Sequence, residues 1–256
     1  MDAEVLQGGN FHGKVVRIGD TVRRPTGPWT PGVHALLRHL EQKGFDGSPR
    51  VLGIDEEGRE VLTFIPGQVI HPEHFDRVAS DKGLTAVARV IRRFHDAVVD
   101  FNSLHRFAWA DWGQAIDRPG ELMCHNDLAP YNLINTPDNR WAFIDWDLAA
   151  PGTRSWDLAC ALLTFIPLMP VEETASSMVS HRLLLFRDAY GPGDMGPEVI
   201  DATVSRCRRA ADVIKTLGDK GEPPFARLLK EGHFETWSRA AEFVEGRASR
   251  WKSILA

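Results

Sequence analysis

Residues 124–132 have the sequence Cys-His-Asn-Asp-Leu-Ala-Pro-Tyr-Asn, and a short apolar strand that ends at Asp145 follows them. These residues are the most informative part of the chain. Pro130 has no backbone N–H and keeps the segment from becoming a helix, so the side chains of Asp127 and Asn132 can face one cleft. A carboxylate there can orient and deprotonate a hydroxyl group. An amide oxygen and a second carboxylate can hold Mg²⁺ against nucleotide phosphates. The pattern therefore predicts a phosphoryl-transfer site.

The spacing His-x-Asp-Leu-x-x-x-Asn, which starts at His125, resembles the catalytic loop of protein kinases, and Asp145 matches their metal-binding aspartate. Protein kinases usually place Arg after the His and Phe-Gly after the metal-binding Asp. Here Asn126 and Trp146-Asp147 stand there, which is similar to the aminoglycoside phosphotransferase and choline kinase family. The run Gly-x-x-Ser-Trp-Asp-Leu-Ala of residues 152–159 resembles that family too. The last third of the chain carries no motif that we can assign.

The resemblance implies an α+β, protein-kinase-like fold of two lobes. Residues 1–65 are expected to form a small, mainly antiparallel β lobe that binds the nucleotide. Residues 66–256 are expected to form a larger, mainly α lobe for catalysis and acceptor binding.

The resemblance also implies the roles of the polar residues, with ATP and Mg²⁺ as cofactors and the hydroxyl of a small molecule as the acceptor. Asp127 would position the acceptor and take its proton, and His125 would brace the loop. Asn132 and Asp145 would bind the metal. Asp157 is expected to anchor the catalytic loop from beneath, while Asp147 is either a further metal-site carboxylate or a loop anchor.

A glycine-rich segment, with Gly8, Gly9 and Gly13, precedes a predicted hairpin made of residues 15–18 and 21–24. Without side chains, the backbone amides of such a loop can approach a triphosphate closely. Glycine clusters also occur in plain turns. The position of this cluster, before a hairpin at the start of a kinase-like chain, favours a nucleotide-covering loop.

In the related fold, a cation on the third strand pairs with the nucleotide phosphates. Arg23 and Arg24 are the candidates, and only one can reach the cleft because neighbouring strand residues face opposite sides. We assign this role to Arg23, which stands two residues before a proline as the family's cation often does.

A helix is predicted for residues 31–43, where the related fold carries the glutamate that pairs with that cation. Val33 and His34 occupy the expected place of this glutamate, and Glu41 lies about two turns further on. The cation therefore either lacks its usual partner or uses Glu41 in a different way.

A second hairpin, of residues 50–54 and 59–65, is predicted to complete the small sheet before Pro66 and Gly67 break the strand. By resemblance this exit is the hinge between lobes, where backbone groups from Thr63 to Ile65 would bond the adenine edge. Beyond it, helices are predicted for residues 81–98 and 156–167, and for three further segments at about 172–190, 197–217 and 224–253. We interpret Arg206, Arg208 and Arg209 as a solvated helix face.

The amino-acid composition limits the classes of partner that we expect for this protein. The chain has a net charge of −5 and no basic face with interleaved aromatic residues, so no nucleic-acid partner is expected. The longest apolar run, residues 158–169, is too short to cross a bilayer, and the acidic N-terminus lacks a signal-peptide pattern. We therefore expect a cytoplasmic protein with no membrane partner. Three cysteines without metal-binding spacing are expected to be reduced and mostly buried: Cys124, Cys160 and Cys207.

Two functions of different classes follow from these residues. The first is ATP-dependent phosphorylation of a small-molecule hydroxyl. The second is nucleotide binding or scaffolding by a non-catalytic, pseudokinase-like protein, which the missing helix glutamate and the use of Arg for Lys favour. The intact set of Asp127, Asn132 and Asp145 favours the enzyme.

Overall fold

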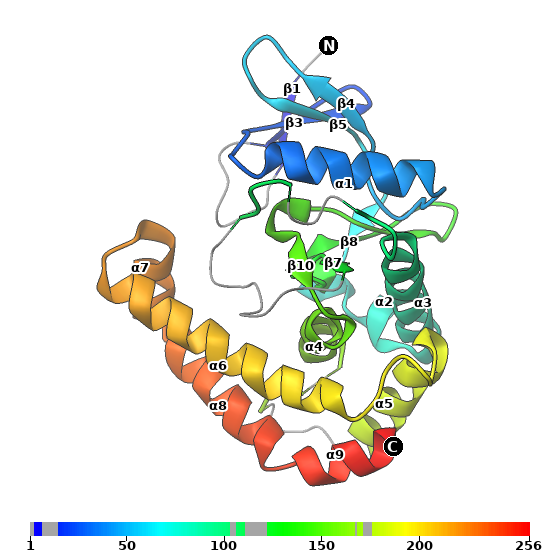
Figure 1. The fold of residues 1–256 in the computed structure, drawn as a ribbon, viewed down its shortest axis with the longest axis vertical. Helices are drawn as coiled ribbons and strands as arrows, with labels where there is room; N and C mark the ends of the chain where they lie inside the picture. Colours follow the sequence, from blue (N-terminus) through cyan, green and yellow to red (C-terminus); the bar gives the residue numbers. More distant parts are fainter. Residues whose placement is uncertain (1–2, 7–14, 103–105, 111–121, 167, 171–175) are drawn as a thin grey trace.

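The computed structural model describes residues 3–6, 15–102, 106–110, 122–166, 168–170 and 176–256. The chain forms a small lobe built on an antiparallel sheet and a larger, mainly helical lobe (Figure 1), as the sequence predicts. The glycines at positions 8, 9 and 13, predicted to cover the nucleotide, lie outside the described residues.

The sheet of the small lobe has five antiparallel strands in the order β1-β2-β3-β5-β4. Both predicted hairpins are confirmed. Between β3 and β5, Arg23 lies opposite Val61 and Arg24 lies opposite Glu60, and this register positions the charged residues of the site. The strands are β1 (Ala3–Leu6), β2 (Val15–Ile18), β3 (Thr21–Arg24), β4 (Val51–Ile54) and β5 (Glu60–Thr63).

The helix α1 (Thr30–Gln42) lies between this sheet and the larger lobe (Figure 1). Pro31 occupies its first turn, where a missing N–H costs nothing. The helix buries Leu36, Leu37 and Leu40, and it is followed by Gly44 with a φ of 71°, a left-handed conformation that suits glycine. The predicted helix of residues 31–43 is confirmed.

Short strands connect the two lobes and carry the catalytic loop between them. The strand β7 (Leu122–Cys124) leads into the loop and pairs with β10 (Ala150–Gly152). The catalytic loop is followed by β8, the central strand of a three-stranded sheet with the order β6-β8-β9. Both strand pairs of this sheet are antiparallel. Its strands are β6 (Gln68–Val69), β8 (Leu133–Asn135) and β9 (Trp141–Phe143), and the short 3-10 turns of this region are η1 (Pro72–His74), η2 (Pro130–Asn132) and η3 (Trp146–Leu148).

Two helices form the centre of the larger lobe. In α3 (Asp81–Ala97), the Ser80 hydroxyl caps the start by accepting a hydrogen bond from the N–H of Gly83, at 3.1 Å. In α4 (Arg154–Phe165), Thr153 is the cap and nearly every residue is buried. Both predicted helices are confirmed, as is the burial of three free cysteines: Cys124, Cys160 and Cys207.

The C-terminal third is helical as predicted, but the single helix expected for residues 224–253 is wrong. Three shorter helices replace it. Gly232, with a φ of 80°, separates the first two, and the segment at Gly246 and Arg247 separates the last two. The helices of the larger lobe besides α3 and α4 are α2 (Asp76–Ala79), α5 (Ser176–Tyr190), α6 (Glu198–Asp219), α7 (Pro223–Lys230), α8 (His233–Glu245) and α9 (Ala248–Leu255).

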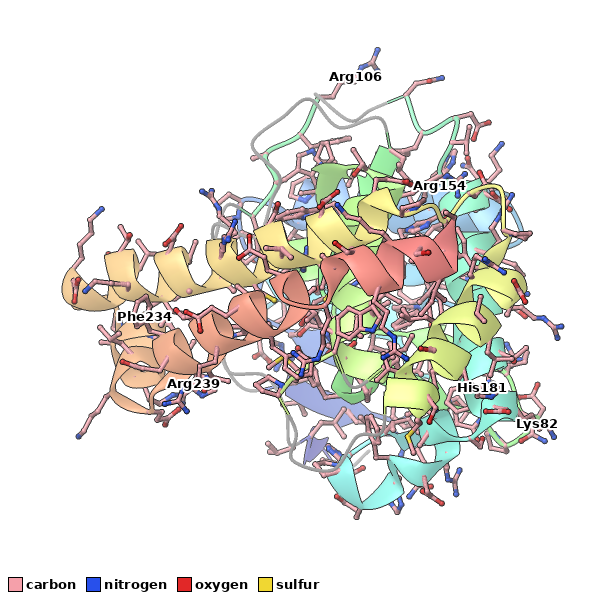
Figure 2. The ribbon with its side chains drawn as sticks, turned by 90° about the horizontal axis from the view of Figure 1, so that it is seen from below. Lys82, Arg106, Arg154, His181, Phe234 and Arg239 are labelled. Atoms are coloured by element: carbon pink, nitrogen blue, oxygen red, sulfur yellow. The ribbon has the colours of Figure 1, made fainter. Side chains whose placement is uncertain are left out.

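The ends of α6 and α8 that join α7 form an arm that extends beyond the body of the larger lobe (Figure 1). Figure 2 shows α8 beside α6, with Phe234 and Arg239 on this arm. Val213, Ile214 and Phe225 form a separate small core there. No helix in the described ranges is long and apolar enough to cross a membrane.

Candidate active site

The catalytic loop is held from beneath by one buried carboxylate on α4. Asp157 is fully buried, and its two carboxylate oxygens accept hydrogen bonds from the backbone N–H groups of His125, at 2.9 Å, and Asn126, at 2.8 Å. Such charge-assisted bonds to consecutive N–H groups fix the path of the loop. Asn126 consequently keeps a left-handed φ of 64°, which its side chain supports by donating to the Leu148 carbonyl.

His125 joins the catalytic loop to the strand that carries Asp145. Its Nε2 donates to the Ile144 carbonyl at 3.1 Å, and its Nδ1 accepts the Asp127 N–H at 3.3 Å. Burial lowers the pKa of His125, so the ring is neutral and this single tautomer satisfies both bonds. The same strand is held again by the Ile144 N–H, which donates to the Asn132 carbonyl at 2.9 Å. These bonds bring the sequence-predicted residues into one site.

Asp127 lies at the centre of this site. Its Oδ2 accepts from the Asn132 amide at 2.7 Å, and its Oδ1 accepts from the Tyr131 hydroxyl at 2.7 Å. Desolvation raises the pKa of Asp127, although the bond from Tyr131 opposes this shift. A carboxylate with a raised pKa is a stronger base than an ordinary aspartate. Because Asn132 donates through its nitrogen, its carbonyl oxygen is the atom suited to a metal.

Asp145 adopts a left-handed backbone conformation with a φ of 60° at the end of the strand. An aspartate in this left-handed conformation has a strained backbone, and residues strained in this way are frequent at functional sites. Its Oδ1 accepts from Arg24 Nη1 at 3.2 Å. The predicted metal ligand is therefore also the partner of the cation on β3.

The cation that faces the site is Arg24, which corrects the assignment of Arg23. Arg24 is only 8% exposed and forms ion pairs with Asp145, with Asp147 and with Glu60, the last at 2.6 Å. Burial opposes its charge, but the three carboxylates outweigh this effect and raise its pKa. Arg23 lies on the other face of β3, where it contacts the Thr21 hydroxyl and Asp55, the latter at 3.5 Å.

The glutamate missing from α1 is supplied by β5. Glu60 lies opposite Arg24 in the sheet, is 2% exposed, and accepts a bond from His34 Nε2 at 2.9 Å. His34 occupies the helix position where the glutamate was expected. The helix thus still contributes to the ion pair, through a histidine that orients the glutamate of the neighbouring strand.

The charges of this cluster fit a divalent cation. Three carboxylates surround the Arg24 guanidinium, so negative charge remains in excess. Within the described ranges, no group of three or more His, Cys, Asp or Glu side chains could hold a metal by itself. Asn132 and Asp145 would therefore bind Mg²⁺ together with phosphate oxygens and water, which suits an ion that arrives with a nucleotide.

The expected hinge lies at the end of β5. The N–H groups of Thr63 and Phe64 already donate within the small lobe, to the carbonyls of Arg50 at 2.9 Å and Asp20 at 2.8 Å. Ile65 follows outside the strand and is half-buried. Of the predicted hinge, the N–H groups of Thr63 and Phe64 are thus already engaged by the protein.

Sequence reasoning missed Tyr131, Glu60 and Arg206. Arg206 was predicted to be solvated, but it is 5% exposed and donates from Nη2 to the Asn126 carbonyl. Its guanidinium carbon lies 5.2 Å from the centre of the Trp156 ring. The sequence contained one signal for the burial of Arg206, which is that it lies next to Cys207 on the apolar face of α6.

A second set of buried bonds supports Asp157. His95 Nε2 lies 3.1 Å from Asp157 Oδ2, and His95 Nδ1 lies 2.8 Å from the Tyr190 hydroxyl. Burial alone would raise the pKa of Asp157, but His95 and the N–H of His125 hold it below its ordinary value. The ionised form of Asp157 is therefore favoured by folding.

We expect this lowered pKa to appear as a pH dependence of stability. Because the folded pKa lies below that of the unfolded chain, about 3.9, the contribution of Asp157 is complete well above that value and is lost as the pH falls through the folded pKa. The difference in unfolding free energy between wild type and Asp157→Asn should thus shrink on acidification, as measured by urea unfolding from pH 7 to pH 3. The exposed Glu57→Gln is the control. A constant difference would contradict the assignment.

The comparisons with known structures place the fold among protein-kinase-like small-molecule kinases. A choline/ethanolamine kinase family protein from Mesorhizobium loti aligns with a TM-score of 0.63 and 19% identity, over 100% of this chain and 92% of that one. Spectinomycin phosphotransferase aligns with a TM-score of 0.65 and 12% identity, over 95% of this chain and 92% of that one. The predicted α+β, protein-kinase-like fold is confirmed.

The sequence comparisons identify the family. The model of the phosphotransferase enzyme family matches residues 101–176, which include the catalytic loop and Asp145. The trifolitoxin immunity protein of Rhizobium leguminosarum bv. trifolii is 32% identical over 200 residues, covering 75% of each chain. This chain belongs to the phosphotransferase enzyme family that contains the aminoglycoside phosphotransferases, as its catalytic loop indicated.

Proposed function

We propose that this protein is an ATP-dependent phosphotransferase that transfers the γ-phosphate to a hydroxyl of a small toxic compound. The observation that carries the proposal is the pair of bonds at Ile144, to His125 and Asn132, which bring Asp145 beside the base Asp127. Membership of the phosphotransferase family supports the reaction class. The similarity to a trifolitoxin immunity protein supports a toxic compound as the acceptor.

In this proposal each residue of the site has one task. Asp127 accepts the proton of the acceptor hydroxyl as its oxygen bonds to the γ-phosphorus and ADP leaves. Asn132 and Asp145 hold Mg²⁺, which neutralises charge on the phosphates when bound. Arg24 contributes the phosphate-binding cation, and His125 keeps the loop in place.

The two lobes would divide the work at the hinge. Residues 1–65 would form the nucleotide-binding lobe, and residues 66–256 would form the lobe for catalysis and acceptor binding. The glycine-rich loop of residues 8–13 would cover the phosphates, and backbone groups from Thr63 to Ile65 would bind the adenine edge. Because the Thr63 N–H is already engaged, the carbonyl of Thr63 and the N–H of Ile65 are the groups proposed for this contact.

The proposal is tested by ADP release from Mg²⁺-ATP in the presence of candidate acceptors. The panel should contain trifolitoxin, spectinomycin, a kanamycin-type aminoglycoside and choline. We expect turnover with a neutral or singly charged hydroxylated compound, because polycationic acceptors need several carboxylates in the pocket. The C-terminal third, which would form one wall of that pocket, has one pair of adjacent acidic residues in its sequence, Glu172-Glu173, and this pair lies outside the described residues. Binding of ATP without ADP release for any acceptor would contradict the proposal and favour a non-catalytic protein.

The metal assignment predicts a distinct result for Asp145→Asn. Thermal stabilisation of the wild type by ATP should require Mg²⁺, because Asp145 and Asn132 would hold the metal and its charge would offset that of the phosphates. In the variant this Mg²⁺-dependent part should be largely lost. Asp138→Asn, an exposed carboxylate on the β8–β9 turn, is the control and should keep the full Mg²⁺ effect. An unchanged Mg²⁺ dependence in Asp145→Asn would show that the metal lies elsewhere.

A further inference from the structure

The base of the site is already bonded through both of its oxygens. Tyr131 Oη donates to Asp127 Oδ1 at 2.7 Å, and the Asn132 amide donates to Asp127 Oδ2 at 2.7 Å. An acceptor hydroxyl must donate to the same carboxylate before it can transfer its proton. Each carboxylate oxygen has two lone pairs, so each internal donor occupies one of the sites that an acceptor hydroxyl can use.

The two donors, Asn132 and Tyr131, differ in how deeply they are buried. The Asn132 side chain is 5% exposed and also donates to the Asp127 carbonyl at 3.1 Å, so its removal would disrupt the loop. Tyr131 is 55% exposed, and its described hydroxyl bond is the one to Asp127. Tyr131 can therefore turn away into solvent at the cost of a single hydrogen bond. The acceptor's place on the base is Oδ1, the oxygen that Tyr131 occupies.

The phenol group of Tyr131 is chemically suited to occupy Oδ1 of Asp127 before an acceptor binds. A phenol keeps its proton at neutral pH, so the Tyr131 hydroxyl serves as the donor in its 2.7 Å bond to Asp127 Oδ1. A water molecule on Oδ1 would instead be oriented and deprotonated as an acceptor would be. Its oxygen would attack the γ-phosphorus, the bond to ADP would break, and Asp127 would take the proton.

We propose that the Tyr131 hydroxyl is a place-holder that occupies the acceptor position on Asp127 and excludes water until the acceptor displaces it. The proposal rests on the proposed phosphotransferase function. It makes Tyr131 a specificity-determining residue, which disfavours transfer to water relative to transfer to a bulkier hydroxylated compound. It requires no chemical change of Tyr131 itself.

The test uses Mg²⁺-ATP alone, because no acceptor is needed to observe hydrolysis. Tyr131→Phe keeps the ring and removes the hydroxyl, so ADP release without acceptor should rise about tenfold, the effect of one hydrogen bond to a charged group. In an Asp127→Asn background the Tyr131→Phe change should have no effect on hydrolysis.

The outcomes separate this inference from the proposed function. If Mg²⁺-ATP still stabilises the proteins thermally and Asp127→Asn lowers hydrolysis, but Tyr131→Phe does not change the rate of hydrolysis, the place-holder is wrong while the enzyme assignment stands. Phosphate found on Tyr131 by mass spectrometry after incubation with Mg²⁺-ATP would also overturn it, because the hydroxyl would then be an acceptor. If Mg²⁺-ATP fails to bind the wild type, both proposals are wrong.

Discussion

Asp127→Asn is expected to lower turnover by about two to four orders of magnitude, the usual contribution of a general base. The amide cannot take a proton from the acceptor hydroxyl. Nucleotide binding should survive, because the proposed metal ligands Asn132 and Asp145 remain and Asp157 still holds the loop from beneath. The measurement is steady-state ADP release with the best acceptor of the panel, together with thermal stabilisation by Mg²⁺-ATP.

The pH profile sharpens this prediction. Desolvation raises the pKa of Asp127, so the wild-type rate should fall as the pH drops through a value above the ordinary aspartate range near 3.9. The rate falls on acidification because only the ionised carboxylate of Asp127 can accept the proton of the acceptor. The residual activity of Asp127→Asn should lack this acid limb. Near-normal turnover, or an acid limb that persists in the variant, would remove Asp127 from the mechanism.

Arg24→Ala is expected to cause the largest loss of stability at the site. Without the guanidinium, Glu60 and Asp147 remain buried with no compensating cation from β3, and uncompensated buried charges cost about 3–5 kcal/mol. Urea unfolding at pH 7 measures this loss. Nucleotide binding should weaken as well, because Asp145 also loses its partner.

The neighbouring arginine provides a matched control. Arg23→Ala removes the same side chain from the same strand, but Arg23 faces the half-exposed side of the sheet and pairs with Asp55. We expect a loss of about 1 kcal/mol or less, as for most surface ion pairs. Adding Glu60→Gln to Arg24→Ala should restore part of the lost stability, because it removes one of the stranded charges. A larger effect of Arg23→Ala would show that the strand faces the other way.

The local sequence determined the elements and the chemistry of the catalytic loop. Residues 124–132 contain the base, the amide and the turn-forming proline within nine positions, so the sequence was sufficient to identify them as one loop, although Asp157 on α4 holds its path. The hairpins and α1, α3 and α4 follow from apolar periodicity and from caps such as Ser80, whose bonds span only three residues. These features could be predicted because their main signals come from residues that are close in the sequence.

The charge network was decided by the tertiary structure. Strand alternation shows that Arg23 and Arg24 face opposite sides, but only the packing of the sheet against α1 and η3 decides which side is the cleft. Glu60 becomes the partner of Arg24 through the β3–β5 register, and Asp145 lies 121 residues away in the chain. A charged residue whose partner is so remote has the same local pattern as a solvated one.

The same reason explains Arg206 and the break at Gly232. Arg206 is buried because α6 packs on α4, which brings its guanidinium to the carbonyl of Asn126, 80 residues earlier. Gly232 ends a helix because α8 turns back along α6 and covers its apolar face. Burial and pairing of this kind arise from contacts between distant elements, whereas the composition of each element is compatible with either an exposed or a buried position.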